Sequence, residues 1–310
     1  MGISVSTRLL LVPLLALAGA TPAFGQVELA GTWGAINHED ALERGPGPYA
    51  VDYAGLPLTD DARARSLAYS ANQLSMIERQ CALYTQLYLV LGPFGLTIWK
   101  DTDAVSGETV ALIIGAWEDR AEMTIWMDGR PHPSRNAPRT RAGFTTGEWQ
   151  GNTLVTRTTH MKTNQLRRNG APASDEAEMT MHVLRHDSLL TVVASLEDPV
   201  YLTERYVLSK TFELSTTPGR PIGPPCQPGY EGVAPGRVPH FLPGQNPFIG
   251  ELTDLYGIPR QAILGGAETM YPEFRNSIRN EFTRPAECSR NCGGARGGGP
   301  PAPAPPANQQ

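Results

Sequence analysis

Hydrophobic and polar positions alternate through the middle of the chain, from about residue 85 to residue 214. β-Branched and aromatic residues gather there in short runs about ten residues apart, and turn residues bound each run. The spacing predicts nine strands, near residues 86–91, 96–101, 108–117, 121–128, 143–149, 153–162, 177–186, 189–197 and 201–214. Several are joined by hairpin-length connections, at 118–120, 150–152 and 186–188. We therefore expect a mainly β fold, an antiparallel β-barrel or sandwich.

Helical spacing occurs on either side of this strand series. Before it, apolar residues recur every three or four positions over residues 61–78, and Thr59 or Asp60 can cap the helix that they predict. After it, shorter helices are expected near residues 248–256, 259–264 and 273–282. The β fold is thus expected to carry flanking helices.

Glycine and proline mark the segments between these elements. The 310 residues include 32 glycines and 28 prolines, which gather in the N-terminal coil, in two loops, in an arm and in the C-terminal tail. Their positions predict five parts: a signal peptide (1–25), an N-terminal coil and helix packed on the barrel (26–84), the barrel (85–214), an irregular Pro/Gly-rich arm with C-terminal helices (215–292) and a disordered tail (293–310).

The first 25 residues have the features of a signal peptide. Arg8 precedes an apolar run from Leu9 to Ala20, and the small residues Ala23 and Gly25 suit signal peptidase. The apolar run has about twelve residues, too few to span a bilayer, which requires about 20. We therefore expect a periplasmic or secreted protein with no membrane anchor after cleavage.

Export would place the four cysteines in an oxidising compartment, where disulfides form. Cys288 and Cys292 could close a small local loop, which would leave Cys81 to pair with Cys226 across about 145 residues. All three pairings of four cysteines stay open. A cysteine nucleophile is the alternative.

Charge and motifs narrow the function. The formal net charge is −5, which argues against a nucleic-acid partner. The chain has no GxSxG, HExxH, phosphate-loop or dinucleotide fingerprint, and we expect no cofactor. His182 and His186 could chelate a metal on a helix, but the alternation around them favours a strand, which would hold them about 13 Å apart. No metal site is therefore expected.

The predicted strand over 153–162 carries the most informative polar residues. Its alternation places Thr156, Thr158, His160 and Lys162 on one face. An inward orientation of that face would line a polar pocket, because such side chains are not buried without partners. An exposed strand face with a lone histidine is the simpler alternative.

Candidate catalytic residues follow from the same strand and its neighbours. His160 and His182 would form a general acid/base group with Lys162 or Arg168 if they met in one cavity. Histidine suits this chemistry because it titrates near neutral pH. The sequence does not specify the register that would bring them together.

Two further groups are candidate ligand contacts. Tyr201 and Arg205 share a face of the last predicted strand and would join Thr156 and Thr158 in the pocket wall. The proline-containing loop after residue 127 could close over a ligand, as loops on rigid scaffolds often do. Its candidate contacts are Trp126, Asp128, Arg130 and His132. In the alternative, Asp128 and Arg130 only order the turn.

Three segments carry a recognisable combination of motifs: MDGRPHP (127–133), GEWQGNTLV (147–155) and TTHMK (158–162). Together with shorter matches they resemble a large family of exported bacterial proteins without an assigned activity. That family usually has an acidic residue where this chain has Asn152. The resemblance implies one integrated β-rich unit over most of residues 28–275, and it supplies no mechanism.

These observations support three hypotheses about function. The leading one is an exported barrel, lipocalin-like in shape, that binds a small, partly apolar molecule, since barrels of about eight strands can hold one small ligand. The second is a cofactor-independent hydrolase, lyase or isomerase that uses a histidine acid/base in the barrel pocket. The third is a structural envelope interaction protein. The sequence leaves the ligand, the inward face of the strands and the oligomeric state open.

Overall fold

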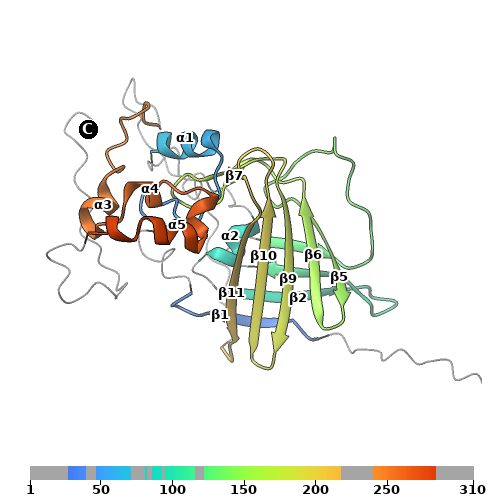
Figure 1. The fold of residues 1–310 in the computed structure, drawn as a ribbon. Coiled ribbons are helices and arrows are strands. Elements are labelled where there is room, and N and C mark those ends of the chain that lie inside the picture. Colours follow the sequence, from blue (N-terminus) through green and yellow to red (C-terminus); the bar gives the residue numbers. More distant parts are fainter. Residues whose placement is uncertain are drawn as a thin grey trace, which may run out of the picture.

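Nine strands close into one barrel in the computed structural model, which describes residues 27–39, 47–70, 81, 86–92, 95–115, 122–217 and 240–283. Around the ring their order is β1-β11-β10-β9-β6-β5-β4-β3-β2. The strands are β1 (Gly31–Ala35), β2 (Leu96–Thr102), β3 (Thr109–Gly115), β4 (Glu122–Trp126), β5 (Phe144–Gln150), β6 (Thr153–Thr159), β9 (Glu178–His186), β10 (Leu189–Glu197) and β11 (Tyr206–Leu214). The predicted mainly β fold is confirmed, as a barrel and not a sandwich (Figure 1).

Two predicted strands differ from the structure. Residues 86–91 form the helix α2 (Gln86–Leu91), because a short apolar run without polar alternation suits a buried helix as well as a strand. The ninth strand is instead β1, which pairs with both β2 and β11 and so closes the ring. The last strand begins at Tyr206, several residues after its predicted start at residue 201.

The odd number of strands rules out a fully antiparallel ring. If the strand direction alternates around a closed ring of nine, at least one pair of neighbours must run in the same direction. These neighbours are β4 and β5, which pair in parallel through Ile125 with Thr145 and Trp126 with Thr146. The prediction of a wholly antiparallel barrel is wrong at this pair. Parallel neighbours need a connection that runs back along the barrel. Residues 127–143, called the crossover below, make that connection.

Helices gather on one side of the barrel (Figure 1), and α2 packs against β10 and β11. α1 (Asp60–Ala68) begins at the predicted cap, where Thr59 accepts a hydrogen bond from the backbone of Ala62. The helix ends at Ala68, because Tyr69 is extended and pairs with His240, so the predicted continuation is wrong at this residue. The rest of it, over 71–78, lies outside the described residues. The remaining helices are α3 (Glu251–Tyr256), α4 (Arg260–Ile263), η4 (Ala267–Met270), α5 (Pro272–Ser277) and η5 (Arg279–Glu281). We call α1, α3, α4 and α5 the helical cap.

Residues 51–59 join the helical cap to the barrel. On one side, Tyr53 N donates to Ile263 O of α4 (2.8 Å). On the other side, Thr59 N donates to Tyr201 O (3.0 Å), in the connection between β10 and β11. Because the segment is held on both sides, it belongs to one core with the barrel.

Several predictions concern residues outside the described ranges. These are the signal peptide, the turn at 118–120, most of the Pro/Gly arm and the C-terminal tail. Cys81 is the one cysteine inside those ranges, and it is not free. Because the other three cysteines lie outside the described residues, the pairing of the four stays a prediction. Within the same ranges, no helix has the length and apolar character needed to cross a membrane.

Candidate functional site

Three threonines form a polar patch on the inner face of the barrel. Buried positions alternate with less buried ones along β5 and β6, so Thr145, Thr156 and Thr158 share the inward face with Leu154. Thr145 lies opposite Thr158, and their hydroxyl oxygens are 2.8 Å apart. Thr156 is 1% exposed, and its Oγ1 has no hydrogen-bond partner among the described residues. We call these three residues the threonine patch.

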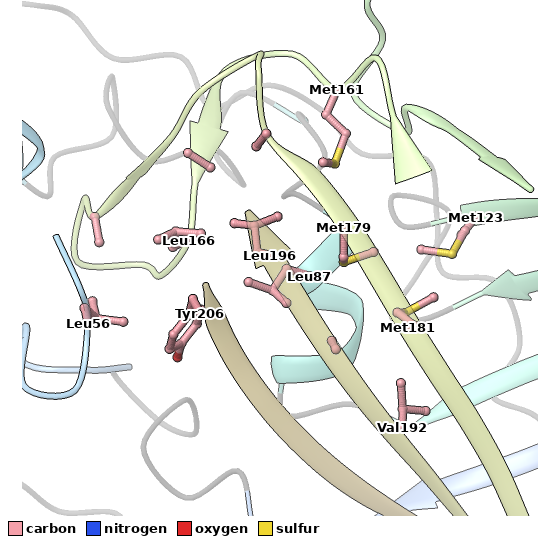
Figure 2. Close-up of a cluster of buried hydrophobic side chains, with 14 of the residues drawn as sticks. Leu56, Leu87, Met123, Met161, Leu166, Met179, Met181, Val192, Leu196 and Tyr206 are labelled. Carbon is pink, nitrogen blue, oxygen red and sulfur yellow. The ribbon is translucent and has the colours of Figure 1, made fainter. Parts of the chain in front are cut away.

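Methionine side chains lie beside the threonine patch. On β9, Met181 is directly opposite Thr156, and Met179 occupies the next inward position. Figure 2 shows both methionines in one cluster with Met123 of β4 and Leu87 of α2. Methionine is unbranched and polarisable, so it fills irregular shapes. The patch is therefore bordered by side chains that can adapt to an occupant.

A buried lysine lies on another wall of the interior. Lys210 on β11 is 3% exposed, and its Nζ donates to the carbonyl oxygen of Gly92, the residue that follows α2. A cation suits this position because the last carbonyl groups of a helix have no partner within the helix. Sequence reasoning did not single out Lys210 or Thr145. In both cases the signal was a polar residue at an inward position of an alternating strand.

Residues 27–30 span one end of the barrel. The Glu28 carboxylate accepts a hydrogen bond from Lys100 Nζ of β2 (2.6 Å), and its backbone carbonyl accepts one from Arg185 of β9. Three strands separate β9 from β2 on one side of the ring and four on the other, so Glu28 links opposite walls. The hydrogen bond from Lys100 is the main reason that the pKa of Glu28 is lowered. Arg185 also lies over the ring of Trp33, which is fully buried at this end.

His160 does not share the inner face with Thr156 and Thr158. β6 ends at Thr159, and His160 has a φ of 58°, in the left-handed region that interrupts strand alternation. Its ring lies against the crossover, where Nε2 is 2.8 Å from Ser134 O. The prediction that His160 shares one strand face with Thr156 and Thr158 is therefore wrong.

His160 and His132 belong to one chain of hydrogen bonds on the outer face of β5 and β6. Thr159 Oγ1 lies 2.7 Å from His160 Nδ1 and 2.8 Å from His132 Nδ1, and His132 Nε2 lies 2.8 Å from Thr146 Oγ1. The carbonyl of Ser134 can only accept, so His160 Nε2 donates to it. With both imidazoles neutral, Thr159 donates to His160, His132 donates to Thr159, and Thr146 donates to His132. This chain attaches the crossover to the barrel wall.

The other residues predicted for acid/base chemistry also lie outside the interior. His182 lies on β9 but faces outward and is exposed. Lys162 is exposed beyond the end of β6, and Arg168 lies between the short strands β7 (Asn164–Gln165) and β8 (Pro172–Ala173). The prediction that these side chains meet in a barrel pocket is wrong. Among the described residues, no three His, Cys, Asp or Glu side chains are grouped so that they could hold a metal ion.

Tyr201 and Arg205 precede β11 and do not share a strand face. Asp198 is buried and accepts hydrogen bonds from backbone groups that include Tyr201 N (3.2 Å), which folds this connection into a turn. The Arg65 guanidinium lies 5.4 Å from the centre of the Tyr201 ring. Arg205 is exposed and forms an ion pair with Glu197. The predicted placement of both residues in a pocket wall beside the threonines is therefore wrong.

Trp126, Asp128 and Arg130 order the start of the crossover. The Arg130 guanidinium carbon lies 3.6 Å from the centre of the Trp126 ring. Arg130 Nε donates to Asp128 Oδ1 (2.9 Å), and this ion-paired hydrogen bond lowers the pKa of Asp128. These contacts match the alternative in which Asp128 and Arg130 order the turn. Their predicted role as ligand contacts stays a prediction.

No family model and no curated protein matches the chain. Two solved structures are similar to it, and both are crystal structures of the fluorescent protein UnaG, one of the wild type and one of a point mutant. Each is 12% identical with a TM-score of 0.26. The match covers 60% of this chain for the wild type and 61% for the mutant, and 97% of the UnaG chain in both cases. A TM-score this low supports no argument about function. Because no family model matches, the resemblance to the exported family stays a prediction.

Proposed function

We propose that the barrel binds a small, partly apolar molecule in its interior. The main support is the Thr156 hydroxyl, which is buried on the inner face without a hydrogen-bond partner among the described residues. A buried polar group left unpaired costs about 1 to 3 kcal/mol, and few such groups occur in native proteins. A bound molecule that supplied the missing partner would recover this free energy.

The surroundings of Thr156 favour a mostly apolar molecule. The buried side chains of the barrel core include Leu154, Met181 and Val192, together with those of Met179 and Leu196. Burial of apolar surface contributes about 25 cal/mol per Å². An apolar body would therefore supply most of the binding free energy, and the threonine patch would orient it.

The buried polar residues of the barrel strands favour ligand binding over acid/base catalysis. On the described barrel strands, the buried polar residues are Thr145, Thr156, Thr158, Thr159 and Lys210. General acids and bases are most often imidazoles or carboxylates, and these buried positions hold neither. The ammonium of Lys210 contacts the end of α2. Recognition is thus the role that these residue types support.

Mass spectrometry of material that co-purifies with the protein tests this proposal. The folded protein is expected to retain a small molecule that organic solvent releases. Thr156→Val removes the hydroxyl and keeps the shape of the side chain, so it is expected to reduce the amount retained. Thr180→Val is the matched control, because Thr180 lies on the outward face of the neighbouring strand β9. Release of no small molecule from the parent protein would count against interior binding.

We further propose that the protein is exported and cleaved after Gly25, as its N-terminal sequence and the family it resembles both suggest. Cleavage there would make Gln26 the first residue, directly before the segment that spans one end of the barrel. N-terminal sequencing of the periplasmic fraction of an expressing bacterium tests this. A sequence that begins at Gln26 is expected, and uncleaved chain confined to the cytoplasm would refute export.

A further inference from the structure

The threonine patch holds more hydroxyl hydrogens than it can pair internally. Its three hydroxyl groups carry one hydrogen each. One of these is used between Thr145 and Thr158, whichever of the two oxygens donates. The second hydrogen of that pair and the hydrogen of Thr156 have no acceptor among the described residues. The patch is therefore arranged to donate two hydrogen bonds to an occupant.

The spacing of these hydroxyls suits a single acceptor oxygen. Thr156 and Thr158 occupy successive inward positions of β6, about 6.6 Å apart along the strand. A carbonyl oxygen that accepts two O–H···O hydrogen bonds of about 2.8 Å along lone pairs about 120° apart holds its two donor oxygens about 4.8 Å apart. The two side chains must therefore lean toward each other by about 1.8 Å in total. One carbonyl oxygen, which has two lone pairs, could thus accept from both.

The charge around the patch favours a neutral oxygen over a carboxylate. The register places the buried cation Lys210 opposite Val192, Val192 opposite Val183, and Val183 opposite Leu154. Lys210 is therefore three strands away from Thr156 and displaced by one inward position. An anion at the patch would be buried without an adjacent countercharge, which is far more costly than burying a neutral polar group.

We propose that the threonine patch is a subsite for the neutral carbonyl oxygen of a ketone or ester whose remaining surface is apolar. This inference rests on the proposed function and names the chemical class of the ligand. The carbonyl oxygen accepts from Thr156 and from the pair of Thr145 and Thr158. The apolar body next to the carbonyl contacts Met179 and Met181, which lie opposite the patch on β9.

Three probes of similar size test this subsite in the full chain. Acetophenone carries a neutral carbonyl, α-methylstyrene has a methylene group in place of the oxygen, and benzoate carries a carboxylate. Thr156→Val is expected to weaken acetophenone binding about fivefold, the effect of losing about one hydrogen bond, and to leave the affinity for α-methylstyrene unchanged. The control Thr180→Val is expected to leave both affinities unchanged. Calorimetry or thermal shift supplies the dissociation constants.

Infrared spectroscopy of bound, carbonyl-labelled acetophenone gives a second measurement, the carbonyl stretching frequency. A change in side-chain packing alone would not shift this frequency. Donation to a carbonyl oxygen lowers its stretching frequency. The band is expected at a lower frequency in the parent protein and in Thr180→Val than in Thr156→Val.

The possible outcomes separate this subsite from the proposed function. Equal losses of affinity for acetophenone and α-methylstyrene in Thr156→Val, or a carbonyl band that the substitution does not move, would overturn the subsite and leave interior binding intact. Tighter binding of benzoate than of acetophenone would overturn the neutral carbonyl and show that the subsite prefers an anion. Failure of all three probes to bind to protein freed of any retained molecule would overturn the subsite, whereas the mass spectrometry described above tests interior binding itself.

Discussion

The left-handed backbone of His160 decides on which side of the barrel wall its imidazole lies. As far as Thr158, the alternation of β6 sends polar side chains inward, and the φ of 58° at His160 ends that alternation. A non-glycine residue in this region carries about 1 to 2 kcal/mol of strain. The hydrogen bonds of the ring to Ser134 O and Thr159 Oγ1 offset it. The imidazole of His160 is thereby kept outside the barrel, while the threonine patch lies inside it.

His132, the second imidazole of this chain, is expected to make the stability of the protein depend on pH. Burial, and then the charges of Arg157 and His160, lower its pKa from the ordinary value of 6.5, while Glu178 acts in the opposite direction. The unfolded chain therefore binds the proton more tightly than the folded chain. Stability is lost as the pH falls through about 6.5, until the folded imidazole is itself protonated.

Urea unfolding across this pH range measures the effect. His132→Gln removes the titrating group, so its free energy of unfolding should fall less between about pH 7.5 and about pH 5.5 than that of the parent protein. His182→Gln is the control, because His182 is exposed on the outer face of β9. Parallel pH curves for the parent and His132→Gln would contradict the prediction.

At the scale of elements, the crossover connects the two parallel neighbours that a ring of nine strands requires. It returns the chain from the end of β4 to the start of β5, its parallel neighbour. A glycine with positive φ stands near each end of it. At Gly129 (φ 73°) an added Cβ would meet open space, whereas at Gly143 (φ 68°) it would lie 2.7 Å from Thr159 O. The two glycines have similar backbones and different packing.

This difference gives a matched pair of substitutions. Gly129→Ala is expected to cost about 1 to 2 kcal/mol, the strain of a left-handed alanine. Gly143→Ala is expected to cost about 2 kcal/mol more, because the Cβ also displaces the wall of the barrel at Thr159 and Met161. Thermal and urea unfolding measure both. Equal losses of stability would show that the crossover is not packed against β6 at Gly143.

At the scale of the whole molecule, the helical cap and the barrel form one core. Residues 51–59 hydrogen-bond to α4 on one side and to the connection between β10 and β11 on the other. Tyr53 and Leu56 within that segment are buried in the same hydrophobic cluster as the barrel residues. Because this segment and the barrel share one hydrophobic cluster, we expect one cooperative unfolding transition.

Two spectroscopic probes distinguish one transition from two. Tryptophan fluorescence reports the barrel, because the described tryptophans are Trp33, Trp99, Trp126 and Trp149, all on barrel strands. Far-ultraviolet ellipticity gives more weight to the helices of the cap. The midpoints of the two guanidinium unfolding curves are expected to coincide. An ellipticity change at lower denaturant would show that the cap unfolds separately.

Local patterns in the sequence were sufficient to predict most barrel strands and the residues that share a face. Strand alternation has a period of two and needs no knowledge of the partner strands, so β9 and β10 could be predicted with the correct bounds to within about a residue. The inward face of β6 could not be predicted, because both of its faces carry threonine. Burial against Met179 and Met181 decided that Thr156 and Thr158 point inward.

Other features depended on closing the ring. The apolar run over 86–91 suits a strand or a helix. In the structure it is a helix, and β1 takes the ninth place between β2 and β11. A parallel pair follows from the odd number of strands, and His160 hydrogen-bonds to the crossover that this pair requires. Ring closure is a property of all nine strands together. For that physical reason no local stretch of sequence contains it, and only the tertiary structure decided it.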